Sequence, residues 1–200
     1  MKLYGDVRSG NCYKIQLLLA LVNSPYDWVP VDILKGETQT PDFLIKNPSG
    51  KIPLLELDDG RYLSESNAII NFLAVGSTYL PSDTFTLAKL QQWQFFEQYS
   101  HEPYIAVARF INKYLGLPEA RKADYIAKQV GGHKALAVME TQLKKTPFLV
   151  SDQCTTADIA LFGYTHVAHE GGFDLDQYPS IQRWIKRMQG LPGFVPMVSS

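Results

Sequence analysis

The feature that most constrains the fold is a change of pattern near residue 76. Before that point, short apolar stretches with strand character alternate with stretches of helical spacing, and after it only helical spacing recurs. Alternating strands and helices are typical of an α/β domain, whereas helical spacing alone is typical of a bundle. The sequence therefore predicts an α/β domain over residues 1–76, a turn-rich linker over 77–83 and an all-helical domain over 84–200.

The first domain is predicted to follow the order β-α-β-α-β-β-α and to form one mixed four-stranded sheet. Strands are expected at Lys2–Gly5, Trp28–Ile33, Ile52–Leu57 and Arg61–Leu63, and helices at Asn11–Val22, from Thr40 onward and at Ser64–Ala74. Pro30 lacks a backbone N–H, which favours an edge position for the second strand. Asp58-Asp59-Gly60 is a hairpin signal between the last two strands.

The second domain is predicted to contain helices only. They are expected at Thr84–Leu115, Glu119–Lys144, Thr156–Glu170 and Ser180–Gln189. Pro103 falls inside the first of these helices and is expected to kink it. Thr155 and Asp158 have the spacing of a capping box at the start of the third helix.

Composition argues against several classes of partner. The 200 residues contain 19 basic and 20 acidic side chains, which give a net charge of −1. The chain therefore has no excess of positive charge that would attract nucleic acid or anionic lipid. No apolar run approaches the roughly 20 residues of a membrane span. The two cysteines, Cys12 and Cys154, form no paired motif, which favours a reducing compartment. We therefore expect a cytoplasmic protein with neither a nucleic-acid nor a membrane partner.

The common nucleotide, hydrolase and zinc-protease motifs are missing from the sequence. His166 and His169 lie three residues apart beside Glu170, a spacing that can hold a metal. An ordinary polar helix end explains them better, so no metal is expected.

Ser9-Gly10-Asn11-Cys12 lies between the first strand and the first helix. Such a turn presents unpaired backbone N–H groups and the positive end of the helix dipole, which stabilise an anion such as a thiolate. Thioredoxin-like redox proteins place C-x-x-C here, but this sequence has Ser9 at the first position. A serine hydroxyl can donate a hydrogen bond to a sulfur brought by a ligand. Alternatively, Ser9 or Asn11 only caps the helix.

Gly50-Lys51-Ile52-Pro53 precedes the third strand. A cis bond at Ile52–Pro53 would leave the backbone of Ile52 free to pair with an extended peptide. The alternative is a trans proline at a strand edge.

Ser64-Glu65-Ser66-Asn67 opens the third helix. Backbone N–H groups and the Ser66 hydroxyl suit a ligand carboxylate, and Glu65 suits a ligand ammonium. The alternative is an ordinary helix start with an acid in its first turn.

Together the three clusters describe a site for a small peptide with a thiol in its middle and a free α-amino acid at one end. Glutathione has this structure. The chain resembles the cytosolic glutathione S-transferases, in a bacterial type with a serine or asparagine active site. The resemblance extends over essentially the whole chain and rests on Asn47–Pro53, Ser64–Ile69 and the Thr155–Asp158 capping box. It implies a thioredoxin-like first domain followed by an all-α second domain, glutathione as co-substrate and a homodimer.

The resemblance also implies roles for single residues. Ser9 matches the thiol-activating serine of theta-, zeta- and delta-like classes, and Asn11 matches the asparagine of a bacterial subgroup that reduces disulfides. The residues expected to bind glutathione are Lys51, Ile52, Pro53, Glu65, Ser66 and, as a weak substitute for the family's histidine, Thr38 or Gln39. Tyr4 comes too early to be an activating tyrosine, and Cys12 is expected to be a core residue.

A second substrate is expected between the domains, against the long helix from Thr84. His101, Tyr104 and Ala108 are spaced to share one face of that helix. Three functions remain open. They are a glutathione transferase acting on small electrophiles, a glutathione-dependent disulfide or peroxide reductase, and a non-enzymatic interaction protein on the same fold.

Overall fold

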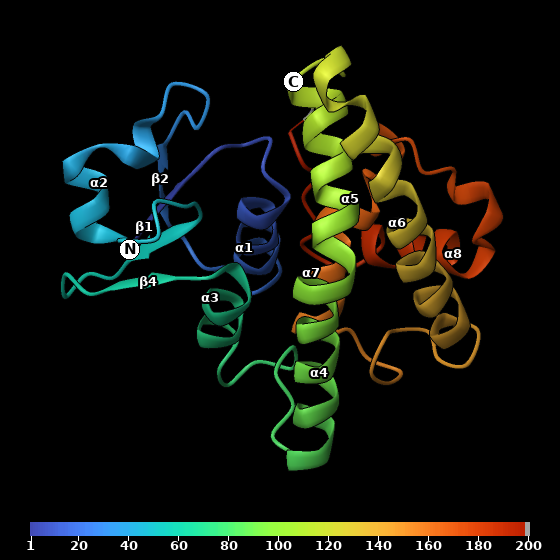
Figure 1. The fold of residues 1–200 in the computed structure, drawn as a ribbon. Helices are drawn as coiled ribbons and strands as arrows, with labels where there is room; N and C mark the ends of the chain where they lie inside the picture. Colours follow the sequence, from blue (N-terminus) through green and yellow to red (C-terminus); the bar gives the residue numbers. More distant parts are fainter. Residues whose placement is uncertain (199–200) are drawn as a thin grey trace. The chain divides into compact units, whose positions relative to one another are not determined.

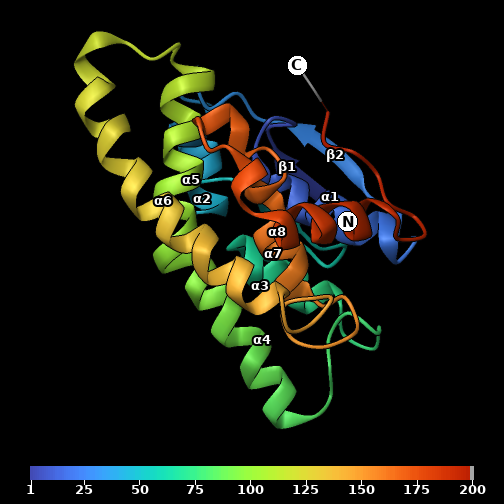
Figure 2. The same cartoon turned by 90° about the vertical axis from the view of Figure 1, so that its right-hand side faces the viewer.

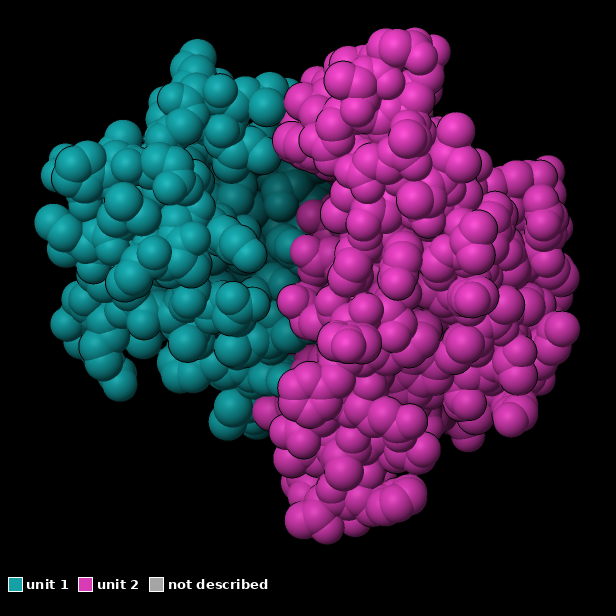
Figure 3. Space-filling view, viewed as in Figure 1, with its two compact units in different colours: residues 1–77, 191–200 teal, residues 78–190 magenta. Residues whose placement is uncertain are grey.

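The computed structural model describes residues 1–198 (Figures 1 and 2). The chain forms two compact units, coloured separately in Figure 3. Unit 1 comprises Met1–Ser77 and the C-terminal segment that starts at Leu191, and unit 2 comprises Thr78–Gly190.

Unit 1 contains one mixed four-stranded sheet. Its strands are β1 (Lys2–Gly5), β2 (Asp27–Pro30), β3 (Leu54–Glu56) and β4 (Tyr62–Ser64), in the order β2-β1-β3-β4. β1 runs parallel to β2 and antiparallel to β3, and β3 pairs antiparallel with β4. The predicted element order and the edge position of β2 are confirmed. At an edge, Pro30 can turn the side that lacks an N–H away from the ladder.

Helices cover both faces of this sheet. Figure 1 shows α2 (Pro41–Lys46) on one face and α1 (Gly10–Leu21) and α3 (Ser66–Leu73) on the other. Side chains of successive strand residues point to opposite faces. Tyr4 and Leu54 accordingly pack with Phe43 of α2. This arrangement confirms the predicted thioredoxin-like domain.

The C-terminal segment packs on α1. The Tyr13 hydroxyl donates a hydrogen bond of 2.8 Å to the carbonyl of Val195. Gly193 has a left-handed φ of +84°, and a Cβ there would lie 3.0 Å from the Ala20 carbonyl. The segment therefore belongs with unit 1, whereas the predicted boundary placed it with the helical domain.

Among its described residues, unit 2 contains helices and loops but no strand. Its α-helices are α4 (Thr84–Phe96), α5 (Glu102–Arg109), α6 (Lys122–Leu143), α7 (Thr156–Thr165) and α8 (Pro179–Gln189). Two π-helical segments, Glu97–His101 and Phe110–Tyr114, follow α4 and α5. The predicted helix over Thr84–Leu115 is continuous, but its hydrogen-bond pattern changes three times, from α to π, back to α and again to π.

The first π-helical segment lies directly before Pro103. Proline lacks the N–H of an α-helical bond, and its ring crowds the carbonyl four residues earlier. The Glu102 N–H instead bonds to the carbonyl of Glu97, five residues back. The helix thus accommodates Pro103 with a wider turn, as single-turn π-bulges do.

The predicted capping box at the start of α7 is present. Asp158 is fully buried and accepts hydrogen bonds from the backbone N–H of Thr155 (2.9 Å) and of Leu149 (2.8 Å). It also accepts from the Thr155 hydroxyl (3.1 Å) and from the indole N–H of Trp184 (3.0 Å). Burial raises the pKa of Asp158, while these bonds act to lower it. Asp158 therefore ties α7, α8 and the preceding loop together.

Three segments of 3₁₀-helix, Glu119–Arg121, Ala168–Gly171 and Leu175–Gln177, complete unit 2. The predicted helix Thr156–Glu170 ends at Thr165, before the second of them. Among residues 1–198, no helix is both long enough and apolar enough to cross a bilayer.

Candidate functional site

Ser9 is the N-cap of α1. Its backbone is extended, with φ −79° and ψ 122°, and its Oγ accepts a hydrogen bond of 3.4 Å from the backbone N–H of Cys12. A hydroxyl group carries one donor and two acceptor sites. Capping uses only an acceptor site, so the Ser9 O–H can still donate to a ligand sulfur. The two interpretations of Ser9 from the sequence are therefore compatible.

Cys12 is a core residue, as expected. Its side chain has no exposed surface, and burial raises the pKa of its thiol to about 12. A Cβ on Gly5 would lie 2.6 Å from the Cys12 sulfur, so the two residues are in close contact. The thiolate is the nucleophilic form of cysteine, and Cys12 forms almost none near pH 7.

Glu65 and Ser66 open α3. Glu65 has φ 69° and ψ 110°, a conformation that L-residues rarely adopt. Its carbonyl accepts the first helical hydrogen bond, of 2.9 Å, from Ile69. The Glu65 side chain is exposed, whereas Ser66 is only 4% exposed. The strained backbone thus turns the Glu65 carboxylate outward at a helix N-terminus, as strain at ligand sites often does.

The N-termini of α1 and α3 are joined by hydrogen bonds between side chains. The Ser66 hydroxyl donates to the Asn11 Oδ1 at 3.2 Å. The Lys14 ammonium, which has no exposed surface, donates to the Ser66 Oγ at 3.3 Å. Ser9, Asn11 and Ser66 therefore belong to one site, at which two helix N-termini converge.

Lys14 was not predicted as a site residue. A signal was present, because Lys14 lies one turn before Leu18 and beside Ile15, on the apolar face of the expected helix. A charged residue at a core position is rarely left without a function in the site it faces.

The loop before β3 is held from two sides. The Asn47 side-chain amide donates to the Lys51 carbonyl at 2.8 Å, and the Gln39 amide donates to the Gly50 carbonyl at 3.0 Å. Gly50 has φ +60°, and a Cβ there would lie 2.6 Å from the Gln39 amide nitrogen. Glycine is therefore required at this turn.

The Ile52–Pro53 bond is cis, as predicted. Pro53 is buried and Ile52 is half-buried against the core of unit 1. Across the residues that the structure describes, no hydrogen bond reaches the backbone N–H or carbonyl of Ile52. The exposed Lys51 side chain precedes it.

Thr38 is buried in the 3₁₀ turn Glu37–Gln39, and its hydroxyl accepts from Gln39 at 3.1 Å. Both residues thus have contacts inside unit 1, and a role for either toward the glycyl carboxylate stays a prediction.

Tyr4 is held within the sheet. Its hydroxyl donates to Glu56 at 2.5 Å, and burial together with this bond raises its pKa to about 12. These contacts agree with the expectation that Tyr4 does not activate a thiol.

The predicted second-substrate residues do not share one exposed face. His101 and Ala108 have no exposed surface, and His101 Nε2 lies 2.9 Å from the Thr165 Oγ1. The prediction that these two side chains line a pocket is therefore wrong. Tyr104 is half-buried, and its ring lies over Gly131 of α6. The cause is tertiary packing, because this side of the helix contacts α6 and α7.

The histidines near the end of α7 have structural contacts. His166 Nδ1 lies 2.6 Å from the Phe162 carbonyl, and burial lowers the pKa of His166 to about 4. Glu170 accepts from Arg109 at 2.6 Å. Within residues 1–198, no group of three or more potential ligands is placed to hold a metal ion.

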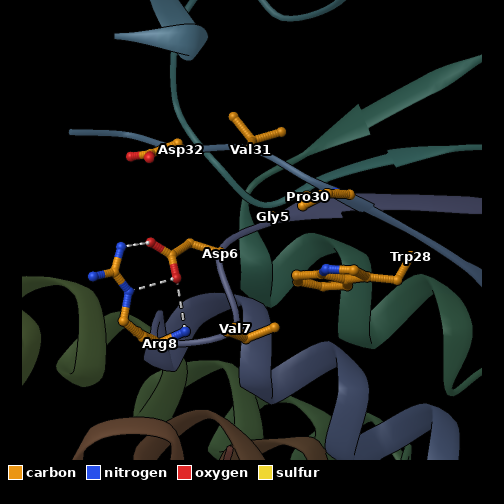
Figure 4. Close-up of a pocket in the computed structure, with 8 residues that line it drawn as sticks. All are labelled: Gly5, Asp6, Val7, Arg8, Trp28, Pro30, Val31 and Asp32. Carbon is orange, nitrogen blue, oxygen red and sulfur yellow. Dashed lines mark hydrogen bonds and ion pairs between the residues drawn. The ribbon is translucent and has the colours of Figure 1, made fainter. Parts of the chain in front are cut away.

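A pocket of about 220 Å³ lies at the carboxyl ends of β1 and β2, and its lining ends at Arg8, the residue before Ser9 (Figure 4). It is lined by Gly5, Asp6, Val7, Arg8, Trp28, Pro30, Val31 and Asp32. Arg8 pairs with Asp6 through its Nη2 at 2.8 Å and its Nε at 3.1 Å. Figure 4 shows the flat Trp28 ring along one side. The pocket combines aromatic surface with charged groups, and its lining comes from two segments of the chain, residues 5–8 and 28–32.

Unit 1 is thus a thioredoxin-like domain with a site at two helix N-termini, and unit 2 is an all-helical domain. Residues 8–75 match the family model of the glutathione S-transferase N-terminal domain, and residues 93–192 match that of the glutathione S-transferase C-terminal domain. The crystal structure of a glutathione S-transferase from Pseudomonas fluorescens is 62% identical, with a TM-score of 0.98, over 99% of this chain and 98% of that one.

Two further proteins are more distant. Glutathione S-transferase F13 of Arabidopsis thaliana is 30% identical, over 98% of this chain and 93% of its own. The structure of maleylacetoacetate isomerase from Methylobacterium extorquens, with bound malonate and glutathione, is 26% identical. Its TM-score is 0.80, over 96% of this chain and 94% of that one. The chain belongs to the glutathione S-transferase family and is an enzyme of that family.

Proposed function

We propose that the protein binds glutathione on unit 1, activates its thiol as a thiolate and transfers it to a small electrophile in the cytoplasm. The observation that carries the proposal is the convergence of Ser9, Asn11 and Ser66 where α1 and α3 begin. In this proposal the Ile52 backbone pairs with the cysteinyl unit, as extended peptides do. Glu65 and the start of α3 hold the γ-glutamyl end, and Lys51 attracts the glycyl carboxylate.

The available donors suffice to activate a thiol. A free thiol has a pKa near 8.5, and lowering it by two requires about 2.7 kcal/mol of preferential anion stabilisation. A hydrogen bond to a charged sulfur contributes about 1.5–3 kcal/mol, and a helix N-terminus adds about 0.3–1 kcal/mol. Ser9 or Asn11, together with α1, can supply this stabilisation without a general base.

Replacing Ser9 by alanine is expected to raise the pKa of bound glutathione by about 1 to 2 and to lower the rate near pH 7 roughly tenfold or more. Glutathione affinity should stay nearly unchanged, because Ser9 does not hold the peptide. The thiolate absorbance of bound glutathione, followed against pH, measures the effect.

Asn11→Ala is the matched comparison. If Asn11→Ala raises the pKa of bound glutathione and Ser9→Ala does not, the Asn11 amide activates the thiol and Ser9 only caps the helix. If neither variant shifts the thiolate absorbance curve, backbone donors activate the thiol and neither side chain contributes to its pKa.

A glutathione-dependent disulfide or peroxide reductase is the second candidate, and Asn11 favours it because it matches the asparagine of a bacterial subgroup that reduces disulfides. In that reaction the thiolate would attack a disulfide sulfur instead of an electrophilic carbon. Comparing turnover of a small disulfide with turnover of an aryl halide separates the two activities.

The pocket beside Ser9 is our proposed place for part of the second substrate. Its lining includes Arg8, the residue before Ser9, and Trp28, Val7 and Val31 provide apolar surface for a flat electrophile. It replaces the surface that His101 and Ala108 were expected to form.

We also propose a two-fold homodimer, and exposed apolar side chains support it. In unit 1, Phe72 is 47% and Val75 71% exposed; in unit 2, Phe95 is 72% and Tyr99 86% exposed. Neighbouring exposed apolar side chains mark protein interfaces.

Light scattering at micromolar concentration should give twice the monomer mass of 22.5 kDa. Tyr99→Glu should shift the mass toward the monomer, because a charge is costly in a buried contact. Ile45→Glu, at an 82% exposed position of α2, is the control and should leave the mass unchanged. A monomer in the unmodified protein would refute the proposal.

A further inference from the structure

A buried carboxylate closes the turn between β1 and α1. Asp6 is 7% exposed, and its Oδ1 accepts hydrogen bonds from the backbone N–H of Arg8 at 2.8 Å and from the Arg8 Nε at 3.1 Å. Its Oδ2 accepts from the Arg8 Nη2 at 2.8 Å (Figure 4). The two middle residues of the turn, Val7 and Arg8, are neither glycine nor proline. The Asp6 side chain therefore supplies the local preference for this turn, as an aspartate bonded to the backbone two residues on does.

The same turn fixes the backbone of Ser9. The Ser9 N–H donates to the Asp6 carbonyl at 3.0 Å, and the Ser9 carbonyl accepts from the Tyr13 N–H of α1 at 2.9 Å. The cap bond from the Cys12 N–H to the Ser9 Oγ is 3.4 Å long, whereas such bonds usually measure about 2.7–3.2 Å. The cap bond alone therefore holds the Ser9 hydroxyl weakly, and the position of this hydroxyl depends on the turn before it.

The contacts of Asp6 contribute geometry more than net stability. Removing a carboxylate from water is costly, and this cost offsets much of the attraction between a buried anion and its cation. The bonds at Asp6 are directional, however, because one carboxylate accepts from both a backbone N–H and the planar guanidinium of Arg8. They therefore restrict the conformations that the turn before Ser9 can adopt.

We propose that Asp6 is a positioning residue, which closes the turn before α1 and so holds the Ser9 hydroxyl where it donates to the glutathione sulfur. This inference rests on the proposed function, and specifically on activation of the thiol by Ser9. The charge of Asp6 does not help directly, because a negative charge near a thiolate disfavours the thiolate. The effect of Asp6 through Ser9 is therefore opposite in sign to its effect through charge.

Two substitutions at this position separate geometry from charge. Asp6→Glu keeps the charge, but the longer side chain no longer closes the turn on the Arg8 N–H. Asp6 lines the pocket of about 220 Å³, which has room for the added methylene. Asp6→Asn loses the charge, but its amide oxygen can accept both of the bonds that the Asp6 Oδ1 accepts.

Asp6→Glu is expected to raise the pKa of bound glutathione by about 1, which lowers the thiolate fraction about tenfold at pH values below that pKa. Thiolate absorbance against pH measures the rise without an electrophile, so a change in the pocket does not affect it. A residue that only stabilises the fold would not move this curve. Asp6→Asn should not raise the pKa. Asp27→Glu, which makes the same change at an exposed position of β2, should not raise it either.

An unmoved curve in Asp6→Glu overturns the proposal, and so does an equal rise in Asp6→Asn. In a Ser9→Ala background, Asp6→Glu should cause no further rise, because both changes remove one interaction. A further rise there would mean that Asp6 acts on the sulfur without Ser9, and the proposal would be wrong.

Asp6→Ala tests the proposal even where Asp6→Glu does not fold. It removes the acceptor and the charge together, so loss of the turn should raise the pKa of bound glutathione, whereas loss of the charge alone would lower it. An unmoved or lowered pKa in Asp6→Ala contradicts a positioning role.

The Ser9 variant distinguishes a failure of this proposal from a failure of the proposed function. If Ser9→Ala raises the pKa of bound glutathione and Asp6→Glu does not, Ser9 activates the thiol and only the role of Asp6 is wrong. If the unmodified protein is not retained on immobilised glutathione, the proposed function itself fails.

Discussion

Asp158→Ala is expected to destabilise the protein by about 4 kcal/mol, the largest effect on stability that we expect from one side chain. The change removes the acceptor for four hydrogen bonds and leaves the N–H groups of Leu149, Thr155 and Trp184 buried without it. Each unsatisfied buried donor costs about 1–3 kcal/mol. For a chain of this size, about 4 kcal/mol corresponds to a fall of roughly 8–16 °C in the melting temperature.

Scanning calorimetry measures this fall, and Asp152→Ala is its control. Asp152 is exposed and lies in the loop before α7, so its removal should change the melting temperature by no more than a degree or two. An equally small change for Asp158→Ala would show that the hydrogen bonds at Asp158 contribute no net stability. Asp158→Asn keeps one acceptor oxygen, so its melting temperature should lie between those of Asp158→Ala and Asp152→Ala.

Local patterns predicted most of the fold because each depends on neighbouring residues. The alternation of strands and helices, the edge strand at Pro30 and the capping box at Thr155 are all set within a few positions of the chain. At Ile52–Pro53 the local pattern allowed either a cis or a trans bond, and the bond is cis.

The errors arose where the outcome depends on tertiary packing. The spacing of His101, Tyr104 and Ala108 indicated a shared helix face but not what covers it. In the structure Tyr104 faces α6, and His101 contacts Thr165 of α7. The contact of the C-terminal segment with Tyr13 depends on residues 182 positions apart, which no local pattern records.

The site was predicted residue by residue, but its internal contacts were not. The sequence indicated separate roles for Asn11 and Ser66, and the structure joins them through one hydrogen bond. Lys14 completes that connection, and its position on an apolar helix face was the overlooked signal.

Glu65→Ala is expected to weaken glutathione binding about thirtyfold, which corresponds to about 2 kcal/mol. Removing one partner of a charge pair at a binding site costs about 2–5 kcal/mol. The lower end applies because Glu65 is exposed in the free protein, where water screens its attraction to the ligand ammonium. Calorimetric titration with glutathione measures the change in affinity.

The melting temperature of the glutathione-free protein is the control for Glu65→Ala. Within the described part of the chain, the Glu65 carboxylate has no hydrogen bond or ion pair, so its removal should leave the melting temperature unchanged. Alanine also tolerates a φ of 69° no worse than glutamate does, because both carry a Cβ. Glu65→Gln keeps the shape without the charge, and a loss as large as that of Glu65→Ala assigns the effect to charge alone. Unchanged affinity in both variants would place the γ-glutamyl ammonium away from Glu65, and the start of α3 would then bind only the carboxylate.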